Sequence, residues 1–134
     1  MQENLYNSFI NDFSDVMCNL ADGNQYSNII FLCIGTDRIT GDSFGPLVGY
    51  KLKSLFFDAK RIDIIGDLEN PVNATNISDI ARQINENYTN PFIIAIDSAM
   101  SNTENIGTIL VNKGPLSVRN KLKQNVYLCR THEY

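Results

Sequence analysis

IIFLCIGTDRITGDSFGPLVGY, residues 29–50, is the stretch that decides the fold of this chain. It opens with an apolar run over residues 29–34, and Gly35 ends that run. A short run that is rich in β-branched and aromatic residues and bounded by glycine is typical of a buried strand in a parallel sheet. Pro46 then favours the first turn of a helix, where its missing N–H leaves no helical hydrogen bond unmade. The stretch therefore predicts a strand, a loop and a helix.

The loop between these two elements, residues 36–42, is mostly polar and contains Asp37 and Asp42. In an open α/β sheet such a loop lies at the carboxyl end of its strand, where ligands and catalytic groups gather. Two acidic side chains are therefore predicted at a position suited to chemistry. A phosphate-binding loop is disfavoured, because the glycine spacing fits neither common pattern, no lysine follows, and acids would repel phosphate.

The remainder of the chain repeats this alternation of apolar strands and amphipathic helices. Helices are predicted at residues 4–20, 46–56 and about 76–88, and strands at 29–34, 61–65, 92–97 and 107–111. Helices of this length between apolar strands indicate right-handed crossover connections. We therefore expect a single α/β domain over residues 1–134 with a mostly parallel sheet.

The two ends of the chain carry different patterns. The first helix has an apolar face that we expect to pack on the core rather than on a partner, formed by Tyr6, Phe9, Ile10, Phe13, Val16, Met17 and Leu20. The tail over residues 117–134 is basic and keeps only a weak apolar alternation around 126–128. We expect part of this tail to be disordered.

Composition excludes several classes of function. With 134 residues and 43% apolar content, the chain is long enough for one core. A net charge of −4 argues against general nucleic-acid binding, which needs a basic face. No apolar run approaches the roughly 20 residues that cross a bilayer. The first residues lack the charged and apolar regions of a signal peptide, so we expect a cytoplasmic protein.

The cysteines show no spacing typical of a metal site. No two of Cys18, Cys33 and Cys129 have the close spacing of a metal-binding motif, and His132 is the only histidine of the sequence. A zinc site is therefore not expected. Cys18 and Cys33 lie in apolar patterns and are expected to be small buried hydrophobic residues. Nothing in the sequence orients Cys129 and His132 as a nucleophilic pair. We expect neither a metal nor a cofactor.

Carboxylates follow three of the predicted strands. Asp42 lies in the loop after the first strand, Asp67 follows the second, and Asp97 ends the third. Neighbouring parallel strands bring such positions together at one edge of the sheet. Two carboxylates within a few ångströms cannot both ionise easily, so one pKa rises and the pair can act as acid and base. Peptide hydrolysis needs both an acid and a base.

Each acid also has a purely structural interpretation. Asp42 could accept N–H bonds from the start of the following helix, and Asp67 is well placed to form a turn. The structural interpretation is weakest for Asp97, because an acid that ends an apolar run is partly buried. These alternatives stay open on the sequence pattern alone.

Three blocks of sequence resemble a known family. FLCIGTDRITGDSFGPLVGYKL, the turn GDLENPVNATNI, and PFIIAIDSAM with GTILVNKGPL resemble the YyaC-type sporulation proteins of endospore-forming bacteria. These are similar to the germination protease that degrades small acid-soluble spore proteins and, more distantly, to hydrogenase maturation endopeptidases. The resemblance covers roughly residues 28–116. It implies a three-layer α/β/α sandwich with a mostly parallel sheet, like the hydrogenase maturation proteases of the phosphorylase/hydrolase-like group.

The resemblance also implies a peptidase site. The acids proposed as the catalytic pair of the germination protease correspond to Asp42 and Asp97. Supporting roles are expected for two further acids and two hydroxyl donors: Asp37, Asp67, Ser43 and Ser98. We expect a metal-independent, sporulation-associated peptidase that acts on a protein or peptide such as the small acid-soluble spore proteins, in the forespore or mother cell.

Two alternatives remain beside this expectation. A catalytically inactive relative would bind a peptide or protein in the same cleft. A metal-dependent maturation protease is disfavoured, because the matching region has no histidine and Asn73 stands where the resemblance implies one. The resemblance further implies a strand and a helix beyond the GPL block, so we expect a C-terminally truncated form. Apolar surface left bare in such a form would favour homo-oligomers.

Overall fold

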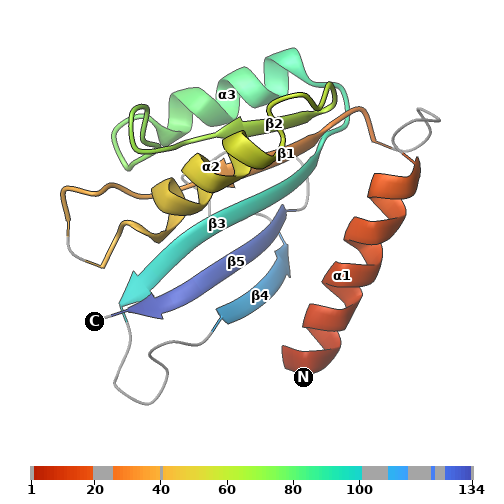
Figure 1. Cartoon of the computed structure of the whole chain (residues 1–134), viewed down its shortest axis with the longest axis horizontal. Coiled ribbons are helices and arrows are strands. Elements are labelled where there is room, and N and C mark those ends of the chain that lie inside the picture. The colour runs from red at the N-terminus through yellow and green to blue at the C-terminus, as the bar shows by residue number, and fades with distance from the viewer. Residues whose placement is uncertain are drawn as a thin grey trace.

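The computed structural model describes residues 2–19, 26–39, 41–100, 109–114, 122 and 126–133. These residues form three helices and five strands (Figure 1). In chain order, the elements are α1 (Gln2–Asn19), β1 (Ile29–Cys33), α2 (Phe44–Leu55), β2 (Ile62–Ile65), α3 (Ile77–Asn87), β3 (Phe92–Met100), β4 (Ile109–Gly114) and β5 (Val126–Glu133).

The five strands form one mostly parallel sheet in the order β2-β1-β3-β5-β4. β1 pairs in parallel with β2 and β3, and β3 pairs in parallel with β5. Only β4, at one edge, runs antiparallel to its neighbour β5. The prediction of an α/β protein with a mostly parallel sheet is therefore confirmed. The carboxyl ends of four parallel strands lie along one edge of the sheet, and the arrowheads of β3 and β5 end side by side in Figure 1.

The largest correction concerns the tail. Residues 126–133, within the tail of which we expected part to be disordered, form β5 between β3 and β4, a strand that the sequence analysis did not predict. Val126 and Tyr127 are almost fully buried, so the weak alternation around them marked a real strand. The pattern was weak because the polar end of β5 lies at the sheet edge where the candidate site is built. The other tail residues, 117–121, 123–125 and 134, lie outside the described residues.

Two strand boundaries also differ from the prediction. β3 continues past Asp97 to Met100, because β5 pairs with it over that whole length. Ser98 is therefore in a strand and not in a loop. β4 covers 109–114 instead of 107–111, and residues 107 and 108 lie outside the described residues.

Alternate residues of the central strands face two separate apolar clusters. Ile29, Phe31 and Cys33 of β1 pack with apolar side chains of α1 and α2. Ile30 and Leu32 pack with side chains of α3. Because side chains of a strand alternate between faces, helices cover both faces of the sheet. None of the helices among the described residues has the length and apolar character needed to span a membrane.

Helix α1 packs less completely than predicted. Val16 is buried, and the rings of Phe9 and Phe13 contact Tyr127 and Phe31 at centroid distances of 5.1 and 6.1 Å. The rest of the expected apolar face is exposed at Tyr6, Ile10 and Met17, and Leu20 lies outside the described residues.

The two cysteines expected to be buried differ. Cys18, near the end of α1, is exposed, so its predicted burial is wrong. Cys33 on β1 is buried as predicted, and burial raises the pKa of its thiol to about 12. Cys33 is therefore a protonated core residue at neutral pH.

Two glycines hold α2 tightly against the sheet. A Cβ added to Gly45 would lie 2.1 Å from the carbonyl oxygen of Ile34, and one added to Gly49 would lie 2.0 Å from that of Gly66. Real Cβ atoms do not approach backbone oxygens this closely, so only glycine fits at either position. The close approach fixes the start of α2 at the end of β1, and thereby sets the position of Asp42.

Candidate active site

Asp97 lies on β3 near the carboxyl edge of the sheet, between β1 and β5. Its side chain is 19% exposed. One carboxylate oxygen accepts the backbone N–H of Ser98 at 2.8 Å, and the other contacts the guanidinium of Arg130 at 3.3 Å. The carboxyl group is thus largely withdrawn from water while it keeps two polar partners.

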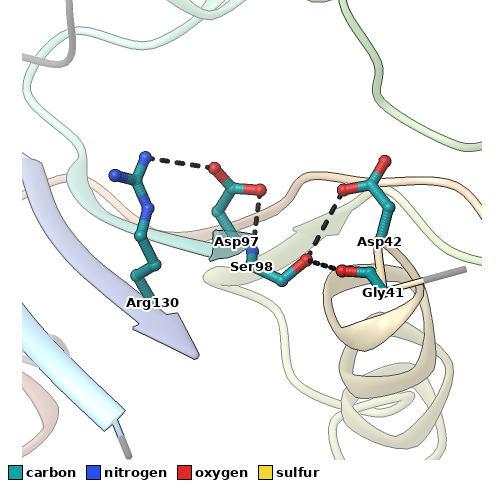
Figure 2. Close-up of polar contacts among 5 residues, drawn as sticks. All are labelled: Gly41, Asp42, Asp97, Ser98 and Arg130. Atoms are coloured by element: carbon teal, nitrogen blue, oxygen red, sulfur yellow. Dashed lines mark hydrogen bonds and ion pairs between the residues drawn. The ribbon is translucent and has the colours of Figure 1, made fainter. Parts of the chain in front are cut away.

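Ser98 connects Asp97 to the loop that follows β1. Its hydroxyl donates to the carbonyl oxygen of Gly41 at 2.9 Å, and it lies 3.5 Å from a carboxylate oxygen of Asp42. The shorter contact is the hydrogen bond of normal length, and the longer one is weak. Figure 2 shows the carboxyl groups of Asp97 and Asp42 on either side of the Ser98 side chain. The structure therefore brings Asp42, Asp97 and Ser98 together, as the sequence analysis expected.

The loop itself fixes the position of Asp42. The carbonyl oxygen of Asp42 accepts the N–H of Thr36 at 2.8 Å, and its N–H donates to the carbonyl of Ile39 at 3.1 Å. Ser43 is the N-cap residue of α2, and no side chain caps that helix start. The alternative role of Asp42 as a helix cap therefore finds no contact among the described residues. Its carboxylate is left to face Ser98.

Burial dominates the ionisation of Asp97. Removal from water raises the pKa of the Asp97 carboxyl above its ordinary value, because the charged form loses hydration. The Ser98 N–H and the Arg130 guanidinium oppose this effect, and the charge of Asp42 adds to it. The net result is an acid that holds its proton to higher pH than an exposed aspartate does.

Arg130 is the member of the site that sequence reasoning missed. It lies on β5, and the register pairs it directly with Asp97. Its Nε is buried and has no hydrogen-bond partner among the described residues. The sequence signal that could have found Arg130 was the weak apolar alternation around residues 126–128. If that pattern is interpreted as a strand and continued by two residues, it reaches Arg130, which pairs with Asp97. Without the strand pairing, a single arginine in a basic tail has no visible partner.

Asp67 belongs to a different structure. It follows β2, and β1 separates that strand from β3. Its carboxylate accepts a hydrogen bond from the ammonium group of Lys53 at 2.5 Å. It also accepts hydrogen bonds from the backbone N–H groups of Glu69 and Asn70 at 3.0 and 2.7 Å. These hydrogen bonds, with that to Lys53 the largest cause, lower the pKa of Asp67 although burial opposes them. Asp67 forms the turn after β2 and lies apart from Asp97.

The remaining expected site residues, Asp37 and Ser43, stay predictions. Asp37 is exposed in the loop, and no contact joins it to Asp97 among the described residues. The Ser43 side chain likewise makes no described contact with either Asp42 or Asp97.

A pocket of about 370 Å³ adjoins Asp42. Its lining includes Ile34, Ile39 and Ala74, and Asp42 forms part of its wall. No three acidic, cysteine or histidine side chains gather as metal ligands in the part of the chain that the structure describes. The site therefore contains the carboxylates of Asp42 and Asp97, the hydroxyl of Ser98 and the guanidinium of Arg130, with a pocket beside Asp42.

Fold and site together define an α/β protein in which Asp42 and Asp97 both contact Ser98 at the carboxyl edge of a mostly parallel sheet. Residues 2–127 match the family described as Protein of unknown function (DUF1256), and the chain belongs to that family.

The chain is also similar to an uncharacterized protein of Bacillus subtilis (strain 168), YyaC. The two are 43% identical over 88 residues, which cover 66% of this chain and 42% of YyaC. The chain thus spans about two fifths of the length of this curated relative. No solved structure matches the chain significantly.

Proposed function

We propose that this protein is a peptidase of spore formation or germination that uses Asp42 and Asp97 as its catalytic pair. The observation that carries the proposal is the junction at Ser98, which contacts the loop of Asp42 and, through its N–H, the carboxylate of Asp97. The sequence blocks that resemble the germination protease contain both acids. The proposed substrates are proteins or peptides such as the small acid-soluble spore proteins.

The proposed fold is the three-layer α/β/α sandwich of the hydrogenase maturation proteases. Support comes from the parallel strand order and from the packing of helices on opposite faces of β1. In such a fold, loops at the carboxyl edge of the sheet carry the chemistry. Asp42 and Asp97 both lie at that edge.

The two carboxyl groups are suited to different steps of hydrolysis. Asp42 accepts a proton from water as the water oxygen bonds to the peptide carbonyl carbon. Asp97 is the proton donor of this scheme, a role that the upward shift of its pKa supports, and it donates its proton to the amide nitrogen as the C–N bond breaks. The proton held by Asp42 then passes to Asp97, which restores the starting state.

Arg130 acts on Asp97 after the proton has left. Its guanidinium lies 3.3 Å from the Asp97 carboxylate and stabilises the charged form that the second step creates. The hydroxyl of Ser98 holds the loop of Asp42 against β3 through Gly41. We propose no metal in this scheme, because the only histidine of the sequence, His132, falls outside the region that resembles the proteases.

The test is incubation of the purified protein with small acid-soluble spore proteins, followed by intact-mass spectrometry. Asp42→Asn removes the proposed base, and Asp37→Asn is the matched control, since Asp37 is an exposed aspartate of the same loop. We expect defined fragments from the wild type and from Asp37→Asn and none from Asp42→Asn. Intact substrate in all three samples, with all three proteins folded, would refute the proposal.

A second candidate is a protein that binds a peptide in the same cleft without cutting it. The ion pair between Arg130 and Asp97 favours this function, because the guanidinium stabilises Asp97 as a carboxylate, and a carboxylate has no proton to donate in hydrolysis. Binding of a peptide that is unaffected by Asp97→Asn, together with an absence of cleavage, would favour this candidate over the peptidase.

A further inference from the structure

The pocket beside Asp42 lies between two segments that are far apart in sequence. The loop after β1 contributes Ile34 and Ile39, and the turn before α3 contributes Asn73 and Ala74. At about 370 Å³ the pocket falls within the size range of small-ligand sites. Asp42 lines this pocket and also lies 3.5 Å from the hydroxyl of Ser98, whose N–H donates to Asp97. A group held in the pocket would therefore lie directly beside Asp42.

Backbone hydrogen bonds fix the walls of this pocket. The N–H of Ile34 donates to the carbonyl of Ile96 at 2.7 Å, and the N–H of Gly35 donates to that of Val72 at 2.8 Å. In the facing turn, the Asn73 side chain accepts the N–H of Thr75 at 2.9 Å. The Asn73 N–H in turn donates to the Asn76 side chain at 2.8 Å. A pocket formed in this way needs little rearrangement to receive a ligand.

The lining of the pocket combines two opposite charges with apolar side chains. Arg38 and Asp42 both line it and carry opposite charges. An acidic or a basic group would meet one attraction and one repulsion from this pair, so the two charges together favour neither sign. The apolar contributions of Ile34, Ile39 and Ala74 favour an aliphatic or aromatic side chain.

We infer that this pocket is a specificity subsite that receives a neutral apolar side chain of the peptide, next to the bond held at Asp42 and Asp97. The inference rests on the proposed function for the identity of the ligand as a substrate. The pocket itself makes a separate prediction about binding. An apolar residue should fill it whether or not the bound peptide is cut.

Binding is tested by NMR titration of the Asp97→Asn protein, which removes the proposed acid, with N-acetyl-leucinamide and with N-acetylglycinamide. The leucine compound should shift the amide signals of Gly35, Ala74 and Thr75, and the glycine compound should not. Ile39→Asp should weaken the binding of the leucine compound about tenfold, since burial of one such side chain changes affinity by roughly that factor or more. No shift at these amides, or equal shifts with both compounds, would overturn the inference.

Ile109→Asp is the matched control for the charge introduced in the pocket. Ile109 and Ile39 are both 60% exposed, but Ile109 lies on β4, three strands away from β1. This control should bind the leucine compound as the parent protein does. An equal loss of affinity in both variants would show that the pocket does not select the side chain, and would overturn the inference.

Cleavage specificity separates this inference from the proposed function. Wild-type protein is incubated with a synthetic peptide mixture that has one randomised position, and the products are identified by mass spectrometry. We expect cuts beside leucine, isoleucine or phenylalanine to exceed those beside aspartate or lysine by about tenfold or more. Cuts without this preference would overturn the subsite and leave the peptidase standing. Selective binding without any cuts would refute the peptidase and leave the apolar pocket standing.

Discussion

Asp67 and Asp97 occupy similar places in the fold, but their pKa values are shifted in opposite directions. Each lies at the carboxyl edge of the parallel sheet, and each side chain is at most 19% exposed. The pKa of Asp67 is lowered, chiefly by its hydrogen bond with Lys53. The pKa of Asp97 is raised, chiefly by burial. Position at a strand end therefore does not decide what an acid does.

The partners of the two acids explain the difference. Asp67 accepts an ammonium at 2.5 Å and two backbone N–H groups, which together outweigh the loss of hydration. Asp97 has one backbone N–H and a guanidinium at 3.3 Å, and a second carboxylate acts against it. One carboxyl is a fixed charge that shapes a turn, and the other is suited to exchange a proton.

The largest effect should come from removing each acid in turn. Asp97→Asn should lower peptide hydrolysis by about 100-fold or more, because general acid catalysis typically contributes that much. Asp67→Asn should leave hydrolysis within about twofold, since Asp67 lies beyond β1 from the pair. Rates are measured on the same substrate after circular dichroism has confirmed folding. Comparable losses in both variants would remove the functional distinction between the two acids.

A substitution that moves Asp42 without changing its charge sharpens the comparison. Gly45→Ala places a Cβ 2.1 Å from the carbonyl oxygen of Ile34, so α2 must shift away from β1. Overpacking of this kind should cost about 2–3 kcal/mol of unfolding free energy in urea denaturation. Ser54→Ala, at an exposed position of the same helix, is the control and should change stability little. Unchanged stability for Gly45→Ala would contradict the close approach.

The charge of Asp67 should contribute stability that depends on pH. Its folded pKa lies below the ordinary 3.8, so the contribution is present above that pH and is lost as acidification proceeds toward the folded pKa. Asp67→Asn should cost about 1 kcal/mol at pH 7, a reduced figure because the Lys53 side chain is 43% exposed.

Urea denaturation at pH 7 and pH 3 measures this effect. The difference between wild type and Asp67→Asn should shrink at pH 3. Lys53→Met should reproduce the effect at pH 7, since it removes the same ion pair. A cost that is constant across this pH range would contradict the assignment of Asp67 as a fixed charge.

The smallest expected effect concerns Arg130. Arg130→Gln removes the guanidinium that lowers the pKa of Asp97, so this pKa should rise further. Arg82→Gln is the control, because the ion pair that the structure gives Arg82 among the described residues is with the exposed Asp79 on the surface of α3. Carbon-13 NMR of the aspartate carboxyl groups follows both variants. A lower pKa for Asp97 in Arg130→Gln would contradict the account of the ion pair.

The sequence predicted the parts of the fold that have strong local patterns. Residues 29–33 and 92–96 are continuous apolar segments, and both are buried within strands of the parallel sheet. The strand at 126–133 was missed because only its first residues are apolar and its remaining residues meet the polar edge of the sheet. Local periodicity carries little information about a strand that is stabilised by pairing with distant segments.

The candidate site was predictable from the sequence only in part. Asp42, Asp97 and Ser98 could be named because they follow apolar strands and belong to the resembling blocks. Arg130 could not, since its contact with Asp97 depends on the register between β3 and β5. The different states of Asp67 and Asp97 were also beyond the sequence, because they depend on which donors each carboxylate meets after folding.

Titration of Asp67 and Asp97 in one folded wild-type sample, by carbon-13 NMR of the side-chain carboxyl groups, tests the central claim most directly. The claim is that one strand-end acid is a fixed charge and the other is a proton donor. We predict that Asp97 titrates above, and Asp67 below, the ordinary aspartate value of 3.8. Titration of Asp97 at or below the midpoint of Asp67 would contradict the claim and, with it, the proposed role of Asp97 as the acid.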